Sequence, residues 1–121
     1  MPAPAEPPES TYLILVSGPD RAAMVELGRR VVTERLAACA NVWTGVHSVF
    51  RWRGEVQEEE EVLVFLKSTA GNLSALGARV RELHPYEEPE FLAFAVDEGS
   101  PSFLAWVAES VRARRGEDGG S

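Results

Sequence analysis

The run Val62-Leu63-Val64-Phe65-Leu66 is apolar at every position. Successive side chains of a strand point to opposite faces of a sheet, so a strand with one wet face alternates apolar and polar residues. Residues 12–16 and 91–96 are also apolar at both parities. The sequence therefore predicts a sheet that is dry on both faces. We expect copies of the chain to cover the second face, because a monomer rarely exposes an apolar patch of that size.

Three helices are expected between and after these strands. The first covers residues 21–38 behind an Asp20 N-cap, and the second covers residues 70–84 and ends before Pro85. The third opens at Ser100 and Pro101. Its last turn is expected to hold three arginines, which suit a helix C-terminus: Arg112, Arg114 and Arg115.

A long hairpin completes the predicted fold. Residues 41–53 are rich in valine and aromatic residues and predict a strand with a bend near Gly45, and the turn at 53–55 leads to a return strand. The order βαββαβ plus a C-terminal helix, with right-handed crossovers, predicts a ferredoxin-like sandwich of the α/β (α+β) class. We expect the hairpin from Val42 to Lys67 to reach a neighbouring copy. The alternative is a monomer whose last helix covers the whole second face.

Length, net charge and cysteine count limit the classes of protein to which the chain can belong. The chain has 121 residues, enough for one domain, expected at 11–115 between disordered tails at 1–10 and 116–121. A net charge of −7 opposes binding to nucleic acid or to an anionic membrane. The single Cys39 excludes an internal disulfide, and neither a membrane span nor a signal peptide is recognisable. We expect a cytoplasmic protein.

Two residues are candidate metal ligands. Cys39 is either a soft ligand for copper or zinc or a small buried apolar residue, and the structural role is favoured because no second ligand stands at metal-binding spacing. His84 precedes Pro85 at a helix end, where it can bind a metal, titrate near neutral pH or bond the last helix carbonyls. His47 lies at the same strand parity as Arg51, which disfavours a metal, so it is assigned to the surface or an interface.

A small-ligand cleft is the other candidate site. Aromatic rings with a few charged groups are typical of such clefts, although interface packing by the rings is an equal alternative. Its expected residues are Trp52, Glu61, Lys67, His84, Tyr86 and Glu90. No catalytic residues are assigned, because no nucleophile–base pair is visible, and we expect a protein that is not an enzyme.

Four stretches together resemble the CutA family of divalent-cation-tolerance proteins. They are Glu34-Arg35-Leu36-Ala37-Ala38-Cys39-Ala40-Asn41, Ser48-Val49-Phe50-Arg51-Trp52-Arg53-Gly54, Arg81-Glu82-Leu83-His84-Pro85-Tyr86-Glu87-Glu88-Pro89-Glu90 and Phe103-Leu104-Ala105-Trp106. The resemblance covers residues 11–112 and implies a ferredoxin-like subunit in a PII-like homotrimer. It also implies a role in tolerance of copper and other divalent metals.

The resemblance also implies where copper would bind. Some family members hold copper through one cysteine and two adjacent histidines, positions that correspond here to Val16, Leu83 and His84. Only His84 can ligate a metal, so tight copper binding is not expected, and Cys39 is a second possible ligand. We therefore expect no required cofactor and weak binding of copper or another divalent cation. The alternative is a PII-like sensor or scaffold that binds a metabolite in clefts between subunits.

Overall fold

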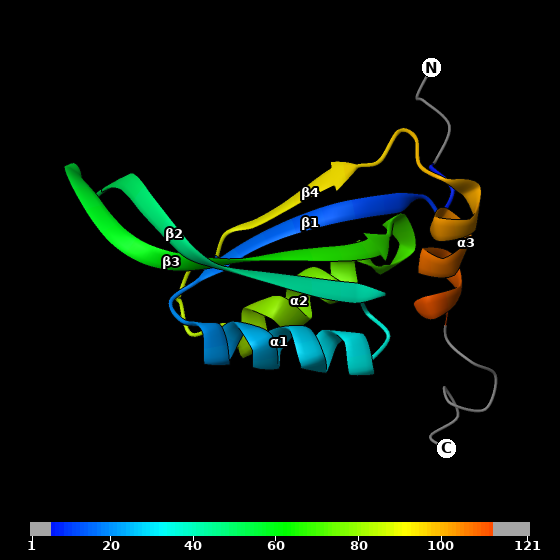
Figure 1. The fold of residues 1–121 in the computed structure, drawn as a ribbon, viewed down its shortest axis with the longest axis horizontal. Coiled ribbons are helices and arrows are strands. Elements are labelled where there is room, and N and C mark those ends of the chain that lie inside the picture. The colour runs from blue at the N-terminus through cyan, green and yellow to red at the C-terminus, as the bar shows by residue number, and fades with distance from the viewer. Residues whose placement is uncertain (1–5, 113–121) are drawn as a thin grey trace.

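The computed structural model describes residues 6–112 as a four-stranded antiparallel sheet with three α-helices (Figure 1). The strands are β1 Thr11–Gly18, β2 Cys39–Trp52, β3 Glu55–Thr69 and β4 Phe91–Ala95. The helices are α1 Arg21–Thr33, α2 Leu73–Leu83 and α3 Pro101–Ser110, with a short 3-10 turn, η1, at Ala70–Asn72. None of these helices is long and apolar enough to cross a membrane. The architecture is the mixed α+β, ferredoxin-like one that the sequence predicts.

The structure describes only part of the two segments that the sequence predicts to be tails. Residues 1–5 and 113–121, which include Arg114 and Arg115, lie outside the described residues. Residues 6–10 are described and contact the body: the Pro8 carbonyl accepts from Gly71 N–H at 2.8 Å, and Glu6 accepts from the Tyr12 hydroxyl at 2.6 Å.

The strands run in the spatial order β2-β3-β1-β4, and each neighbouring pair is antiparallel. Helices α1 and α2 lie side by side on one face, whereas α3 stands at one end of the sheet (Figure 1). The core forms between the sheet and α1 and α2. Its fully buried members include Ile14, Val16, Met24, Leu27, Val31, Val64, Leu66, Leu76 and Val80.

Helix α1 ends five residues before the expected boundary at residue 38. Arg35 adopts φ 62°, and the Arg35 N–H bonds the Val32 carbonyl at 3.1 Å while the Leu36 N–H bonds the Val31 carbonyl at 2.9 Å. This pair of bonds is the Schellman motif that terminates helices, here with arginine at the position that glycine usually takes. The helix prediction over 34–38 was therefore wrong, because the C-terminal cap overrides the continuing apolar periodicity.

The other helix predictions hold with smaller corrections. Asp20 caps α1 as predicted, since its Oδ1 accepts from Ala23 N–H at 2.8 Å. The start of the second predicted helix is the 3-10 turn η1, and α3 ends at Ser110, so the placement of Arg112 in its last turn was wrong. Ser100 occupies the N-cap position of α3 but makes no side-chain capping bond.

The predicted hairpin is present, with its expected bend near Gly45 and its expected turn after Trp52. The β2–β3 register shifts between Trp43 and Val46, where Gly45 has φ 78°. The turn consists of Arg53 and Gly54, both with positive φ, which matches the type I′ geometry favoured in two-residue hairpins. We call residues 46–61 the hairpin arm. It projects past the ends of β1 and β4 (Figure 1).

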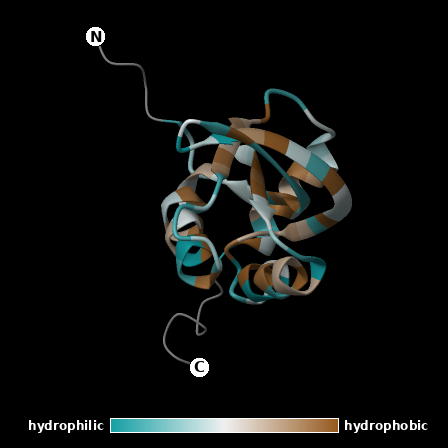
Figure 2. Cartoon of the chain, turned by 90° about the vertical axis from the view of Figure 1, so that its left-hand side faces the viewer, coloured by the Kyte–Doolittle hydropathy of each residue, from teal (hydrophilic) through white to brown (hydrophobic). Residues whose placement is uncertain are grey.

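The sheet face opposite α1 and α2 is apolar, and we call it the open face. Its side chains come from positions of one parity on β1, β3 and β4: Leu13, Leu15, Leu63, Phe65, Leu92 and Phe94. Leu92 is 48% exposed and Phe94 51%. Figure 2 shows hydrophobic residues along the strands above the two helices. Helix α3 covers only one end, where Val107 and Val111 pack with Ala38, so the alternative of a last helix that covers the whole face was wrong.

Candidate functional site

The segment between α2 and β4, residues 84–90, is anchored by a buried histidine, and we call it the His84 loop. Pro85 ends α2, and His84 turns into extended backbone. The His84 Nε2–H donates to the Ser17 carbonyl at 2.6 Å, and the Tyr86 N–H donates to His84 Nδ1 at 3.0 Å. The hydrogen-bond partners thus assign the proton to Nε2. Sequence reasoning left three roles open for His84, and one of them was a bond to the last carbonyls of its own helix; its side chain instead bonds the Ser17 carbonyl at the end of β1.

These contacts bear on the copper site that the resemblance implies. Both nitrogens of His84 are engaged, so neither presents a free lone pair to a metal in this arrangement. Val16 is fully buried in the core, and Leu83 packs against that core. The three residues at the copper positions therefore do not form a metal site.

Tyr86 links the His84 loop to the base of the hairpin arm. Its ring packs against His84 with centroids 4.8 Å apart, and its hydroxyl donates to Glu61 Oε2 at 3.2 Å. Burial, followed by the nearby Glu61 carboxylate, raises the pKa of Tyr86 to about 12. The phenol therefore stays protonated at physiological pH and acts as a hydrogen-bond donor.

Lys67 and Cys39 form a separate cluster on the open face. They are paired across β2 and β3. The Lys67 ammonium donates to Asn41 Oδ1 at 2.5 Å, and the Cys39 thiol lies 3.9 Å from the same oxygen. Asn41 thus places a cation and a soft nucleophile side by side at the edge of an otherwise apolar surface.

The two candidate metal ligands lie at opposite ends of β1. Cys39 is paired with Lys67, which is opposite Leu13, whereas His84 contacts Ser17. The four residue steps from Leu13 to Ser17 span about 13 Å of strand. Among the described residues no group of three or more His, Cys, Asp or Glu side chains could hold a metal ion. One subunit therefore does not bring Cys39 and His84 to a common ion.

The six residues expected to form the ligand cleft do not all lie together within one subunit. Three of its six residues are neighbours: Glu61, His84 and Tyr86. Lys67 stands six residues from Glu61 along β3, which is about 20 Å. Trp52 lies 51% exposed beside the hairpin turn with the Arg53 guanidinium 5.5 Å from its ring centre, and Glu90 is exposed. These groups can share a cleft only if different subunits contribute them.

A charged cluster on the hairpin arm was missed in the sequence analysis. His47 Nε2 lies 2.7 Å from Glu58 Oε1, and Nδ1 lies 3.0 Å from Glu60 Oε1. Hydrogen bonds that His47 donates, first to Glu58 and then to Glu60, raise the pKa of His47. Both contacts are satisfied together only by the doubly protonated ring. Glu58 and Glu60 share one parity, and the turn at Arg53 and Gly54 fixes which of them face His47, so the pairing could have been found from the turn.

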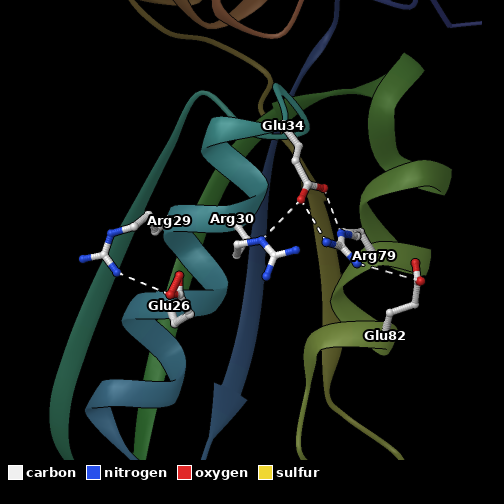
Figure 3. Close-up of polar contacts among 6 residues, drawn as sticks. All are labelled: Glu26, Arg29, Arg30, Glu34, Arg79 and Glu82. Atoms are coloured by element: carbon white, nitrogen blue, oxygen red, sulfur yellow. Dashed lines mark hydrogen bonds and ion pairs between the residues drawn. The ribbon is translucent and has the colours of Figure 1, made fainter. Parts of the chain in front are cut away.

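A second missed cluster joins α1 to α2 (Figure 3). The Arg79 guanidinium donates to both oxygens of Glu34, at 2.8 and 2.9 Å, and Arg30 lies 3.5 Å from the same carboxylate. Arg79 foremost holds the pKa of Glu34 below its usual range. The pair fixes α2, which carries the His84 loop at its end, against the end of α1. Helical periodicity does not reveal contacts between helices, so no sequence pattern indicates this pair.

The class of protein is defined by a ferredoxin-like α+β subunit with a projecting hairpin and one uncovered apolar sheet face. Solved structures of the same class include CutA from Xylella fastidiosa, with a TM-score of 0.83 and 34% identity over 85% of this chain and 99% of that one.

The sequence profile described as "CutA1 divalent ion tolerance protein" matches residues 12–110. The chain is 38% identical to the divalent-cation tolerance protein CutA of Thermus thermophilus over 99 residues, which cover 82% of this chain and 96% of that one. It is 35% identical to the Escherichia coli K12 protein of the same name over 85% of this chain and 92% of that one. The chain therefore belongs to the CutA1 family of divalent ion tolerance proteins, as its four sequence stretches predict.

Proposed function

We propose that this protein acts in divalent-cation tolerance as a cytoplasmic homotrimer, and that it binds copper or another divalent cation weakly rather than catalysing a reaction. The family name supports the tolerance role. The open face is the observation that carries the assembly, because Leu92 and Phe94 are about half exposed on a sheet whose other face is fully packed. Removing such a surface from water is favourable by roughly 25 cal/mol per Å² of apolar area, and the part that exceeds the entropy cost of association stabilises the assembly.

The hairpin arm supports closure of the subunits into a ring, and the number three is taken from the PII-like homotrimer that the family resemblance implies. Strands β2 and β4 are the two edges of the sheet, and their backbone groups are available for pairing with another chain. The arm carries exposed apolar side chains well beyond its own sheet, including Val49 at 61% and Val56 at 62%. An arm that reaches the next subunit's edge makes a head-to-tail contact, and such contacts form a ring when the rotation from one subunit to the next closes.

Light scattering coupled to gel filtration tests the assembly. We expect a mass three times the 13.2 kDa of the subunit. Phe94→Lys places a charge on the open face and is expected to release monomers, whereas Ala75→Lys, on the exposed side of α2, is expected to leave the trimer intact. A monomeric wild-type protein at micromolar concentration, or an equal effect of the two variants, contradicts the proposal.

The proposed copper contact rests on Cys39, whose thiol is a soft ligand and is partly exposed. His84 contributes only if its bond to Ser17 breaks. Competition with a copper(I) chelator tests this assignment with three variants. We expect Cys39→Ser to weaken binding, His84→Ala to leave it nearly unchanged, and His47→Ala to match the wild type. Equal copper affinity in Cys39→Ser and the wild type removes the cysteine from the site.

Lys67 favours a second candidate function, a PII-like sensor that binds a metabolite between subunits. A lysine held by Asn41 at the border of an apolar face suits an anionic ligand with an apolar part. A thermal-shift screen with anionic metabolites tests it, because a true ligand raises the melting temperature by mass action. The rise should disappear in Lys67→Ala and persist in Arg21→Ala, an exposed cation on the helix side. A panel without any shift excludes this candidate.

A further inference from the structure

A hollow of about 450 Å³ lies between α2 and the His84 loop, and we call it the α2 groove. It is on the helix side of the sheet, so it is separate from the open face. Its apolar lining comes from Leu73, Val80, Pro89 and Phe91. The volume lies in the range of small-molecule sites in proteins, which are mostly apolar with a few polar groups.

Two opposite charges also line the groove. Arg81 projects from α2 and Glu88 from the His84 loop. Within residues 6–112 neither side chain makes an ion pair or hydrogen bond, with the other or with any third residue. Other charged side chains nearby are paired, for example Arg79 with Glu34. The groove therefore presents one free cation and one free anion, within the described part of the chain, beside an apolar surface.

The wall that carries Glu88 and Pro89 is held in place before any ligand arrives. His84 ties the start of the loop to Ser17, and Tyr86 ties its middle to Glu61. A rigid wall lowers the entropy cost of binding. The buried His84 and the Tyr86 hydroxyl thus act as positioning residues for the groove.

Gly77 keeps the groove open from the helix side. A Cβ added there would lie 3.7 Å from the Phe91 ring, which is ordinary van der Waals contact, so sterics do not require glycine. Glycine inside a helix costs about 1 kcal/mol relative to alanine. The absence of a side chain at this position leaves the Phe91 ring accessible to a ligand.

We propose that the α2 groove binds a free α-amino acid with an apolar side chain. The ligand's carboxylate pairs with Arg81, its ammonium pairs with Glu88, and its side chain packs on Phe91 and the neighbouring apolar lining. Arg81 and Glu88 do not contact each other, and a zwitterion can pair with both of them. A simple anion or cation would leave one of the two protein charges without a partner. The proposal does not depend on metal binding, and no residue of the open face takes part in it.

Isothermal titration of the full-length protein with leucine, phenylalanine and tryptophan tests the proposal. We expect saturable binding, and roughly tenfold weaker binding when the ligand is replaced by its amide or its N-acetyl derivative, each of which removes one charge. Arg81→Gln and Glu88→Gln should each weaken binding of the amino acid about tenfold. The matched control Glu87→Gln, on the same loop but outside the groove lining, should bind as the wild type does.

Pairing each variant with the matching ligand separates a direct contact from a general loss of structure. Arg81→Gln should not weaken binding of the amide further, because that ligand no longer offers a carboxylate. Gly77→Leu should abolish binding by filling the groove, while Ala75→Leu, outside the lining on the same helix, should not. The melting temperature shows that each variant folds. No saturable binding at about 10 mM, where a millimolar site is mostly occupied, or equal losses in Glu87→Gln and Glu88→Gln, overturns the proposal.

Discussion

The two histidines of the chain are held in opposite ways. His84 is 7% exposed and bonds only backbone groups, the Ser17 carbonyl and the Tyr86 N–H. His47 has a side chain 55% exposed and lies between the carboxylates of Glu58 and Glu60. The hydrogen bonds of His84 are buried and connect elements of the helix-covered body. The ion pairs of His47 lie on the projecting hairpin arm, where solvent and salt screen them.

A histidine contributes most to stability where its hydrogen bonds are buried. A buried polar group that loses its partner incurs a desolvation cost, because water cannot replace the bond. An exposed ion pair that is broken is solvated at once, so little is lost. Neither arrangement is that of a preformed copper ligand, although His84 stands in one of the four stretches that resemble the CutA family. Its position there is explained by the loop that it anchors.

Replacing His84 is expected to have the largest effect. His84→Ala leaves the Ser17 carbonyl and the Tyr86 N–H without partners and creates a cavity, so we expect the free energy of unfolding to fall by about 2–4 kcal/mol. Chemical denaturation at one fixed protein concentration measures it. His47→Ala is the matched control and should leave the midpoint nearly unchanged. Similar losses in the two variants would remove the contrast between the body and the arm.

Replacing Tyr86 tests the link between body and arm. Tyr86→Phe removes one hydrogen bond to Glu61 and keeps the ring against His84, so we expect a loss of about 1 kcal/mol. In Tyr12→Phe, which leaves Tyr86 as the only tyrosine, ultraviolet titration should show a pKa near 12. Titration at the ordinary tyrosine pKa of about 10 would show that the phenol is neither buried nor close to Glu61.

The contact between α1 and α2 should show the next smaller effect, with a defined pH dependence. Arg79 lowers the pKa of Glu34, so the pair stabilises the folded state above the unfolded pKa of about 4.5 and loses that contribution as pH falls through the folded value. Glu34→Gln should therefore lower the melting temperature at pH 7 and should not lower it near pH 2. Glu26→Gln, at a mostly exposed pair on α1, is the control. A pH-independent deficit would assign the effect to packing.

The sequence determined the fold because its signals were local or periodic. The Asp20 cap, the bend at Gly45 and the turn at Arg53 and Gly54 each depend on neighbouring residues, and the structure confirms them. The covered second face that strand parity indicates stays a prediction, because Leu92 and Phe94 are about half exposed in one chain. The end of α1 was missed because its cap places an arginine where glycine is usual. Such an exception depends on contacts that the local pattern does not contain.

The candidate site was harder to predict, because it depends on pairs distant in the sequence. His84 meets Ser17 across 67 positions, and Arg79 meets Glu34 across 45. The six residues expected in the cleft are chemically suited to binding a small ligand. Within a single subunit, however, Lys67 and Trp52 lie far from Tyr86. The α2 groove was not foreseen at all, because an unfilled volume has no pattern in a sequence.

His47 should show the smallest effect on stability and the clearest spectroscopic one. Glu58 and Glu60 raise its pKa, so its contribution is fully present below the unfolded pKa of about 6.5 and is lost as pH rises through the folded value. NMR titration of the imidazole should give a pKa above 6.5 that falls in Glu58→Gln and falls further when Glu60→Gln is added. Salt should weaken the shift, because the cluster is exposed and screened. The control is Glu59→Gln, because the Glu59 side chain points to the other side of the arm, and it should change the pKa of His47 least. If it lowers that pKa as much as Glu58→Gln does, the net charge of the arm, rather than the contacts with Glu58 and Glu60, sets the pKa of His47.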